Sequence, residues 1–143
     1  MKKGVLVFLA GVWGAGTVPL SAETTAPLAA AHEALSRGDH RSARRAAREA
    51  LQSQGPSAPA YTVLGEVALA QGRASRARGY FRRALKRDGR CAPAYWGLGR
   101  LQEKRGRLDE AANEYRAAVL ADPSHAAATE ALARLKEQAV SKE

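Results

Sequence analysis

Glycine recurs at a spacing of 34 residues through most of this chain, at Gly38, Gly72 and Gly106. A fixed period of this length is typical of stacked helical arrays, in which each unit buries its apolar face only against its neighbours. The period therefore predicts a series of helical hairpins. The alanines that follow the same period are Ala43, Ala77 and Ala111, then Ala50, Ala84 and Ala118.

A chain of 143 residues fits one compact domain. Hydrophobic residues make up 45% of it but aromatic residues only 6%, because much of the apolar content is alanine. Small side chains let helix axes approach closely, and strand-forming residues are scarce after the first twenty positions. We therefore expect an all-α fold.

The clearest unit runs from Ala58 to Cys91. Pro59 suits the first turn of a helix, where its missing N–H costs nothing. Apolar residues then recur at helical spacing up to Gly72, and glycine can take the left-handed conformation that ends a helix. A second apolar stripe over residues 77–85 predicts a second helix, which Asp88-Gly89 ends. The unit is therefore expected to be a helix, a tight turn and a helix.

The units on either side follow the same scheme to different degrees. Residues 92–125 repeat it closely, whereas residues 24–57 keep Gly38 but have alanine in place of Leu-Gly and of the aromatic residue. That first unit is either a degenerate repeat or an ordinary helical hairpin that caps the others. After Pro123, we expect Ser124 to cap a last helix over residues 126–140.

The two clear units resemble the tetratricopeptide repeat, with an aromatic residue, Leu-Gly, a turn glycine, then alanine, an aromatic residue, alanine and a closing proline. The resemblance implies a helical-hairpin solenoid of about three repeats, residues 24–57, 58–91 and 92–125, closed by a solvating helix. It also implies a concave surface, lined by the first helix of each pair, that binds other proteins. The residues that carry it are Tyr61, Leu64, Gly65, Gly72, Ala77, Phe81 and Ala84, then Tyr95, Leu98, Gly99, Gly106, Ala111, Tyr115, Ala118 and Pro123.

Within the concave surface that the resemblance implies, Trp96 is the strongest candidate for partner binding. It follows the core residue Tyr95, so it points about a quarter turn away from the core stripe, and an aromatic residue beside Arg100 is typical of a binding hot spot. The alternative is that Trp96 packs between repeats. The candidate groove residues are His32, Leu35, Ser36, Thr62, Glu66, Leu69, Ala70, Trp96, Arg100, Glu103 and Lys104.

Some members of the family clamp a terminal carboxylate with lysine and asparagine. This chain has Glu66 and Arg100 where the asparagines of successive units would stand, so no such clamp is expected.

Basic residues are concentrated on the predicted second helices, and the whole chain carries a net charge of +9. The simplest interpretation is a solvated convex face. The alternative is attraction to an anionic envelope surface, such as membrane headgroups or envelope polymers, or to an acidic protein. Nucleic acid is not expected as a partner of an exported protein. The residues are Arg41, Arg44, Arg45, Arg48, Arg76, Arg78, Arg82, Arg83, Lys86 and Arg87.

The chain begins with two lysines, an apolar run from Gly4 to Leu20 and small residues at Ser21-Ala22. This order is typical of a secretory signal. It predicts a signal peptide over residues 1–22, cleaved after Ala22, and a secreted or periplasmic protein. Cleavage would lower the net charge from +9 to +7, because two lysines leave with the leader. An uncleaved leader that anchors the chain in a membrane is the alternative.

The residue types that catalysis or a cofactor needs are not brought together. The histidines lie far apart at His32, His40 and His125, and no cysteine pair supports them, so no metal site is predicted. Cys91 is the only cysteine. It is expected to be a small buried residue beside a helix end, with a bond to a partner chain as the alternative.

We therefore predict an exported adaptor, without enzymatic activity or cofactor, that holds a protein or peptide segment in its concave groove. The first alternative is a basic module that binds an envelope or membrane surface through its convex arginines. The second is one part of a larger assembly that docks through residues 24–57. The sequence leaves the oligomeric state and the identity of the partner open.

Overall fold

The structure is a computed structural model and describes residues 20–142. These residues form seven α-helices and no strand, which confirms the predicted all-α fold. The helices are α2 (Leu20–Ser36), α3 (His40–Gln54), α4 (Ala58–Ala70), α5 (Ala74–Arg87), α6 (Ala92–Lys104), α7 (Leu108–Ala121) and α8 (Ala126–Val140).

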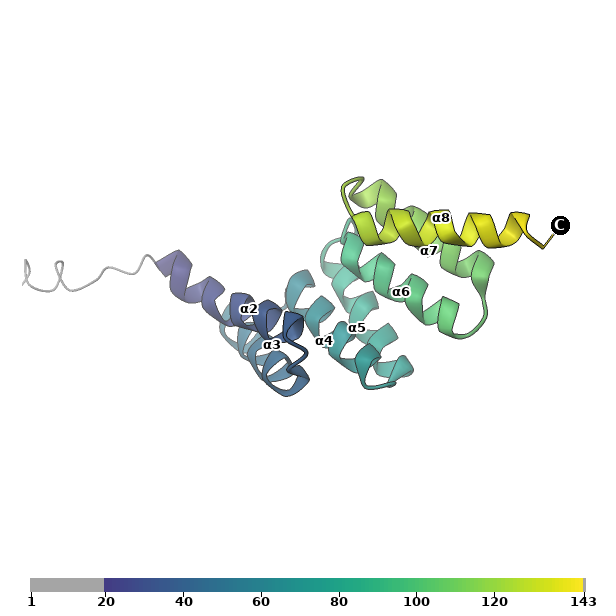
Figure 1. The fold of residues 1–143 in the computed structure, drawn as a ribbon. Helices are drawn as coiled ribbons and strands as arrows, with labels where there is room; N and C mark the ends of the chain where they lie inside the picture. The colour runs from purple at the N-terminus through teal and green to yellow at the C-terminus, as the bar shows by residue number, and fades with distance from the viewer. Residues whose placement is uncertain (1–19, 143) are drawn as a thin grey trace, which may run out of the picture.

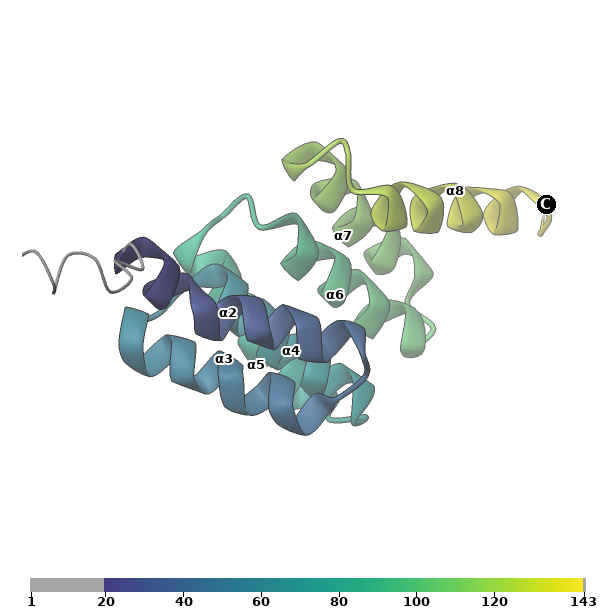
Figure 2. The ribbon, with the colours of Figure 1, turned by 60° about the vertical axis from the view of Figure 1, so that its left-hand side comes forward.

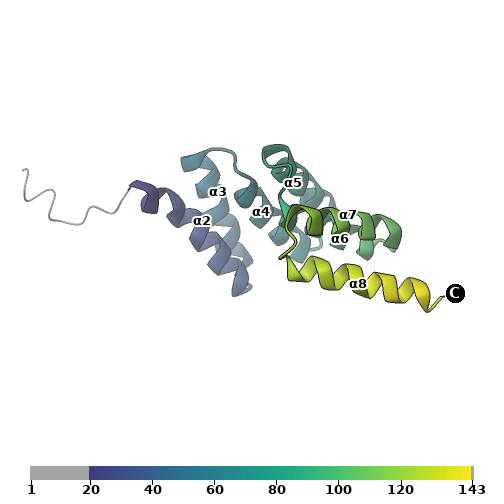
Figure 3. The same cartoon turned by 90° about the horizontal axis from the view of Figure 1, so that it is seen from above.

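Consecutive helices form hairpins that stack side by side into an elongated array (Figure 1). The hairpins are α2–α3, α4–α5 and α6–α7, and the second helix of each also packs against the first helix of the next. Seen from above, α8 lies against the last hairpin and ends the array (Figure 3). Because α2 contacts α4 and α4 contacts α6, the first helices form one continuous surface. In the turned view, α2 and α3 lie in front of α4 and α5 (Figure 2).

The periodic glycines make the turns within the hairpins, as predicted. Gly38, Gly72 and Gly106 have φ angles of 74°, 71° and 75°, in the left-handed region that a side chain disfavours. The N–H of the residue after the glycine then donates to a carbonyl five residues back, as from Arg73 to Ala68 at 2.8 Å. This closes each first helix in the same way and keeps the hairpins alike.

Aromatic side chains join the hairpins, and glycines make room for them. Phe81 of α5 is fully buried, and its ring lies against Gly65 of its own hairpin and Gly97 of the next. A Cβ atom added at Gly65 would lie 2.5 Å from the ring. One repeat later, Tyr115 has the same relation to Gly99. The Leu-Gly pair of the repeat is therefore a packing requirement.

The first hairpin meets this requirement with smaller residues. Ala47 stands at the position of Phe81, and it is buried in one cluster with Ala31 and Val63, which stand at the positions of the two glycines. Ala47 is smaller than the phenylalanine of the next repeat, and Ala31 and Val63 are larger than the two glycines. Together they fill the contact between the first two hairpins without an aromatic ring.

The predicted cap of the last helix is wrong by one residue. Ser124 does not cap α8, because its N–H and its hydroxyl both donate to Asp122 Oδ1, at 2.9 and 2.6 Å. His125 is the cap instead, and its Nδ1 accepts from the N–H of Ala128 at 3.2 Å. The helix is buried through Leu132 and Leu135, which lie in the last core cluster.

Residues 1–19 of the predicted leader lie outside the described residues, so cleavage after Ala22 stays a prediction. None of the helices in the described part of the chain is both long and apolar enough to cross a membrane.

The fit of Phe81 between two glycines predicts the effect of adding one methyl group. In Gly97→Ala, the new Cβ would overlap the Phe81 ring, which is walled in on its other side by Gly65. We expect a loss of about 1–3 kcal/mol in the free energy of unfolding, measured by urea denaturation, since overpacking a filled core costs this much.

Gly79→Ala is the matched control, because an added Cβ at this exposed position of α5 meets nothing within 4 Å. For Gly79→Ala we expect the free energy of unfolding to rise by about 0.5–1 kcal/mol, because alanine has a higher helix propensity than glycine. Equal effects at the two positions would contradict the proposed role of the glycines.

Candidate functional site

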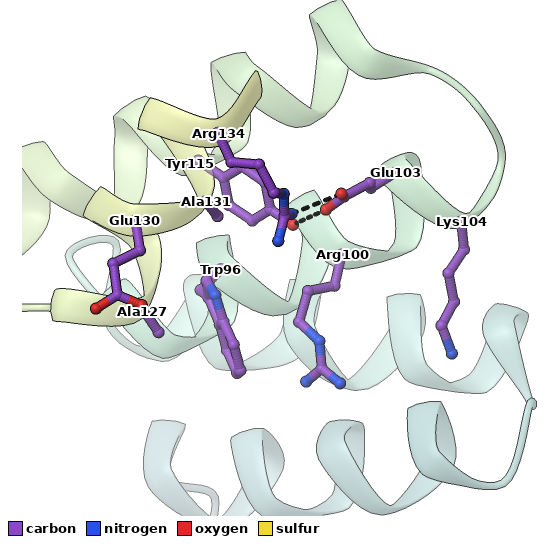
Figure 4. Close-up of a pocket in the computed structure, with 9 residues that line it drawn as sticks. All are labelled: Trp96, Arg100, Glu103, Lys104, Tyr115, Ala127, Glu130, Ala131 and Arg134. Atoms are coloured by element: carbon purple, nitrogen blue, oxygen red, sulfur yellow. Dashed lines mark hydrogen bonds and ion pairs between the residues drawn. The ribbon is translucent and has the colours of Figure 1, made fainter. Parts of the chain in front are cut away.

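A cavity of about 690 Å³ opens between α6 and α8 (Figure 4). It lies at the end of the surface formed by the first helices, which is where the sequence predicts the groove. Residues of α6 and α8 supply its walls, and α7 contributes one tyrosine. The lining residues are Trp96, Arg100, Glu103, Lys104, Tyr115, Ala127, Glu130, Ala131 and Arg134.

Trp96 combines the two arrangements that its sequence position left open. Its ring packs against the last core cluster and lies 5.7 Å from the His125 ring, centroid to centroid. The side chain is nevertheless only half-buried and lines the cavity. Arg100, one turn further along α6, holds its guanidinium 4.5 Å from the centre of the indole. A cation over an aromatic face is attracted to it, so the indole is held in place before any partner arrives.

Glu66 holds the same guanidinium group of Arg100 by an ion pair. The guanidinium donates to Glu66 Oε2 at 2.9 Å, across the contact between α4 and α6. The two residues occupy the same position in successive repeats, 34 residues apart. Burial raises the pKa of the Glu66 carboxyl, and the charge of Arg100 opposes that rise. The two positions at which the family can place clamp asparagines are therefore occupied by an internal ion pair.

A second acidic group, Glu103 of α6, is also held by neighbouring side chains. Glu103 accepts from the Tyr115 hydroxyl at 2.7 Å and pairs with Arg134 of α8 at 2.6 Å, as the dashed lines show (Figure 4). Burial, together with the bond to Glu103, raises the pKa of the Tyr115 hydroxyl. The tyrosine is thus a neutral donor that orients the carboxylate. The ion pair ties α8 to α6 across the mouth of the cavity.

Two of the predicted groove residues belong to the core, and those predictions are wrong. Thr62 is buried, its hydroxyl donating to the carbonyl of Ala58 at 2.8 Å and lying 3.5 Å from the sulfur of Cys91. Leu69 is 2% exposed and packs in the central core cluster. Both face the neighbouring hairpin because α4 is packed on both sides, and such a helix buries more of its circumference than an end helix does.

The predicted residues of the first hairpin are not part of the cavity. His32 is exposed on α2, whereas Leu35 is half-buried against the first core cluster. Ser36 and Ala70 are exposed, as a groove position requires, but neither lines the cavity. The structure thus brings together Trp96 and the three polar residues of α6, with Glu66 as their neighbour.

Sequence reasoning missed the half of the site that α8 provides. Ala127, Glu130, Ala131 and Arg134 line the cavity, although this helix has only the role of a solvating cap in the sequence prediction. A signal was available, because residues 126–138 follow the 34-residue period and place α8 where another first helix would stand. Arg134 of this helix bonds to Glu103 at 2.6 Å.

The predicted basic residues lie on α3 and α5, away from the cavity. Arg41, Arg44, Arg45 and Arg48 border a separate open hollow of about 660 Å³ along α3. On α5, Arg83 lies over the ring of Tyr80, with 5.8 Å between the guanidinium carbon and the ring centre. Binding of an anionic surface by these residues stays a prediction. The remaining predicted members are Arg76, Arg78, Arg82, Lys86 and Arg87 of α5.

Cys91 is buried beside the start of α6, as predicted. Within residues 20–142, no three histidine, cysteine, aspartate or glutamate side chains come close enough together to hold a metal ion.

Comparison with known families gives a direct match. The family described as "Tetratricopeptide repeat" matches residues 28–95, 62–126 and 97–141, three overlapping stretches that together span most of the chain. The chain belongs to the tetratricopeptide repeat family. The third stretch takes in α8, in agreement with its position in the array. A comparison with curated proteins gave no match.

Solved structures of other tetratricopeptide repeat proteins are similar to this one. The domain of Arabidopsis OM64 is 23% identical, with a TM-score of 0.68, over 80% of this chain and 95% of that one. The first domain of Spaghetti (RPAP3), solved with an HSP90 peptide, is 14% identical, with a TM-score of 0.68, over 87% and 99%. An O-GlcNAc transferase mutant from Thermobaculum terrenum is 26% identical, with a TM-score of 0.72, over 84% of this chain but 23% of that one.

The Glu66–Arg100 pair predicts a pH-dependent loss of stability when the arginine is removed. Burial raises the Glu66 pKa above 4.5 and Arg100 lowers it, so in Arg100→Ala the pKa rises further. When the pKa of a carboxyl is higher in the folded state than in the unfolded state, the carboxyl stabilises the fold at pH values below the unfolded-state pKa. This stabilisation is lost as the pH rises through the folded-state pKa. We expect Arg100→Ala to lower the free energy of unfolding, measured by urea denaturation, by about 1–3 kcal/mol near pH 7 and by less near pH 4.

Arg37→Ala serves as the control, because Arg37 pairs with Glu33 at 2.8 Å on the exposed face of α2. Arg37→Ala should change the free energy of unfolding by no more than about 0.5 kcal/mol at both pH values. An equal loss near pH 4 and pH 7 for Arg100→Ala would show that Arg100 acts through its packing on Trp96 and not through charge.

Proposed function

We propose that this chain is an exported adaptor that binds a segment of another protein in the cavity between α6 and α8. The observation that carries the proposal is the half-buried Trp96, held between Arg100 and His125 on the wall of an open cavity. Tryptophan and arginine are enriched among the residues that contribute most to binding at protein interfaces. The fold is a protein-interaction module, and two of its structural neighbours were solved with HSP90 and HSP70 peptides.

The cavity suits a segment with an apolar anchor and polar flanks. Trp96, Ala127 and Ala131 offer apolar surface, while Lys104 and Glu130 are exposed at its edge. The remaining charges are already paired within the chain, which saves a partner the cost of ordering them. A free terminal carboxylate is not the expected anchor, because Glu66 neutralises Arg100.

The binding role of Trp96 is tested with peptides selected from a random library on the intact protein. Trp96→Ala should weaken the binding of a selected peptide by at least about 1 kcal/mol, or about fivefold in Kd, measured by isothermal titration calorimetry. The variant should keep its helical circular-dichroism spectrum, because the indole is only half-buried.

Leu120→Ala is the control for loss of an exposed apolar side chain, since Leu120 is 77% exposed on α7 and outside the cavity. It should leave the Kd unchanged. A folded Trp96→Ala variant that binds every selected peptide as well as the wild type would refute the proposed site.

Export is tested by the N-terminus of the protein made in its natural host. If the leader is cleaved after Ala22, mass spectrometry of the purified protein should find Glu23 as the first residue, in the periplasmic or secreted fraction. An intact leader in the membrane fraction would favour the anchored alternative. A cytosolic protein that keeps Lys2 and Lys3 would refute export.

A further inference from the structure

A shallow crease bordered by arginines runs between α3 and α5, away from the cavity. Arg44 and Arg48 of α3 form one side, and Arg73 and Arg76 at the start of α5 form the other, next to Tyr80. Apolar side chains of α4 lie at its base. None of its described lining residues carries a carboxylate, and none of the four arginines forms an ion pair with a side chain of residues 26–142.

The chain contains its own comparison for this crease, because the equivalent positions recur 34 residues later between α5 and α7. There Arg78 and Arg82 replace the two arginines of α3. At the other side, Glu110 and Glu114 stand where the first crease has its last arginine and its tyrosine. The two creases thus share a basic side, but only the second has acidic residues opposite it.

The acidic residues of the second repeat interact with their basic neighbours. Glu110 lies 3.5 Å from Arg107, in the first turn of α7. Glu114 is half-buried, and burial raises the pKa of its carboxyl while the charge of Arg82 opposes that rise. The second set of positions therefore has carboxylates of its own chain beside its arginines, and the first has none.

We propose that the crease between α3 and α5 binds an acidic segment of a partner protein. Its carboxylates would be counterions for these arginines, as Glu110 and Glu114 are for Arg107 and Arg82 one repeat later. Those two glutamates are four apart, or about one helical turn, so the fitting partner is a helix with glutamates at that spacing. Guanidinium groups bind carboxylates through strong, charge-assisted hydrogen bonds. The positive end of the α5 dipole adds to the attraction.

The crease is independent of the cavity that holds Trp96, so a partner could occupy both at once. An acidic protein helix is favoured over a membrane or a free phosphate by the next repeat, where carboxylates on one face of a helix stand opposite the equivalent arginines.

The probe is a short synthetic helix with two glutamates four residues apart, and its control is the same peptide with glutamines. The full chain should bind the glutamate peptide at least about tenfold more tightly, by fluorescence anisotropy at low salt. Arg76→Glu, which copies the arrangement of the next repeat, should weaken that binding at least about tenfold. Arg48→Gln should also weaken it.

Arg90→Glu makes the same charge change in the exposed turn before α6, outside the crease, and should alter the Kd by less than about twofold. Trp96→Ala should bind the peptide like the wild type, which separates this proposal from the function of the cavity. Arg76→Glu is expected to keep its circular-dichroism spectrum, since glutamate is favourable in a first turn.

Three results would overturn the proposal. One is equal binding of the glutamate and glutamine peptides. Another is an equal loss in Arg76→Glu and Arg90→Glu, which would show that only net charge matters. The third is tight binding of phosphatidylglycerol vesicles or inorganic phosphate through Arg48 and Arg76 without binding of the peptide.

Discussion

The seating of one aromatic ring against the glycines of two helices determines how closely consecutive hairpins approach. Phe81 fills the space between Gly65 and Gly97, so the backbones of α4 and α6 both come into contact with its ring. A methyl group on either glycine would push the hairpins apart. Because the core around it is otherwise largely alanine, which has little side chain with which to adjust, this ring sets the spacing between the second and third hairpins.

The functional geometry follows from this spacing. Hairpins of equal shape, stacked at an equal distance, bring residues one period apart next to each other on the surface of the first helices. Glu66 and Arg100 meet in this way, and their ion pair then holds Arg100 over Trp96. The internal contact that makes Phe81 a spacer therefore also determines where the indole stands in the cavity.

The sequence predicts the parts of this structure that depend on the period. Helices, turn glycines and the position of Trp96 follow from it, because each needs only the local pattern and the stacking rule. The wrong predictions for Thr62 and Leu69 arise because the width of the buried face depends on whether a helix has neighbours on both sides. The contribution of Arg134 was missed because α8 was treated as a cap, and its contact with Glu103 is a tertiary one.

The repeats are most informative where they depart from one another. At the groove, one position is acidic in one repeat and basic in the next, and Glu66 and Arg100 satisfy each other. At the crease, Arg76 is basic where Glu110 of the next repeat is acidic. No carboxylate of the described side chains forms an ion pair with Arg76. Equivalent positions of successive repeats have the same surroundings in the fold. An arginine that has a carboxylate beside it in one repeat and none in the next therefore reflects a difference that folding alone does not require. The proposed partner of the crease would therefore supply the carboxylates that the adjacent repeat already contains.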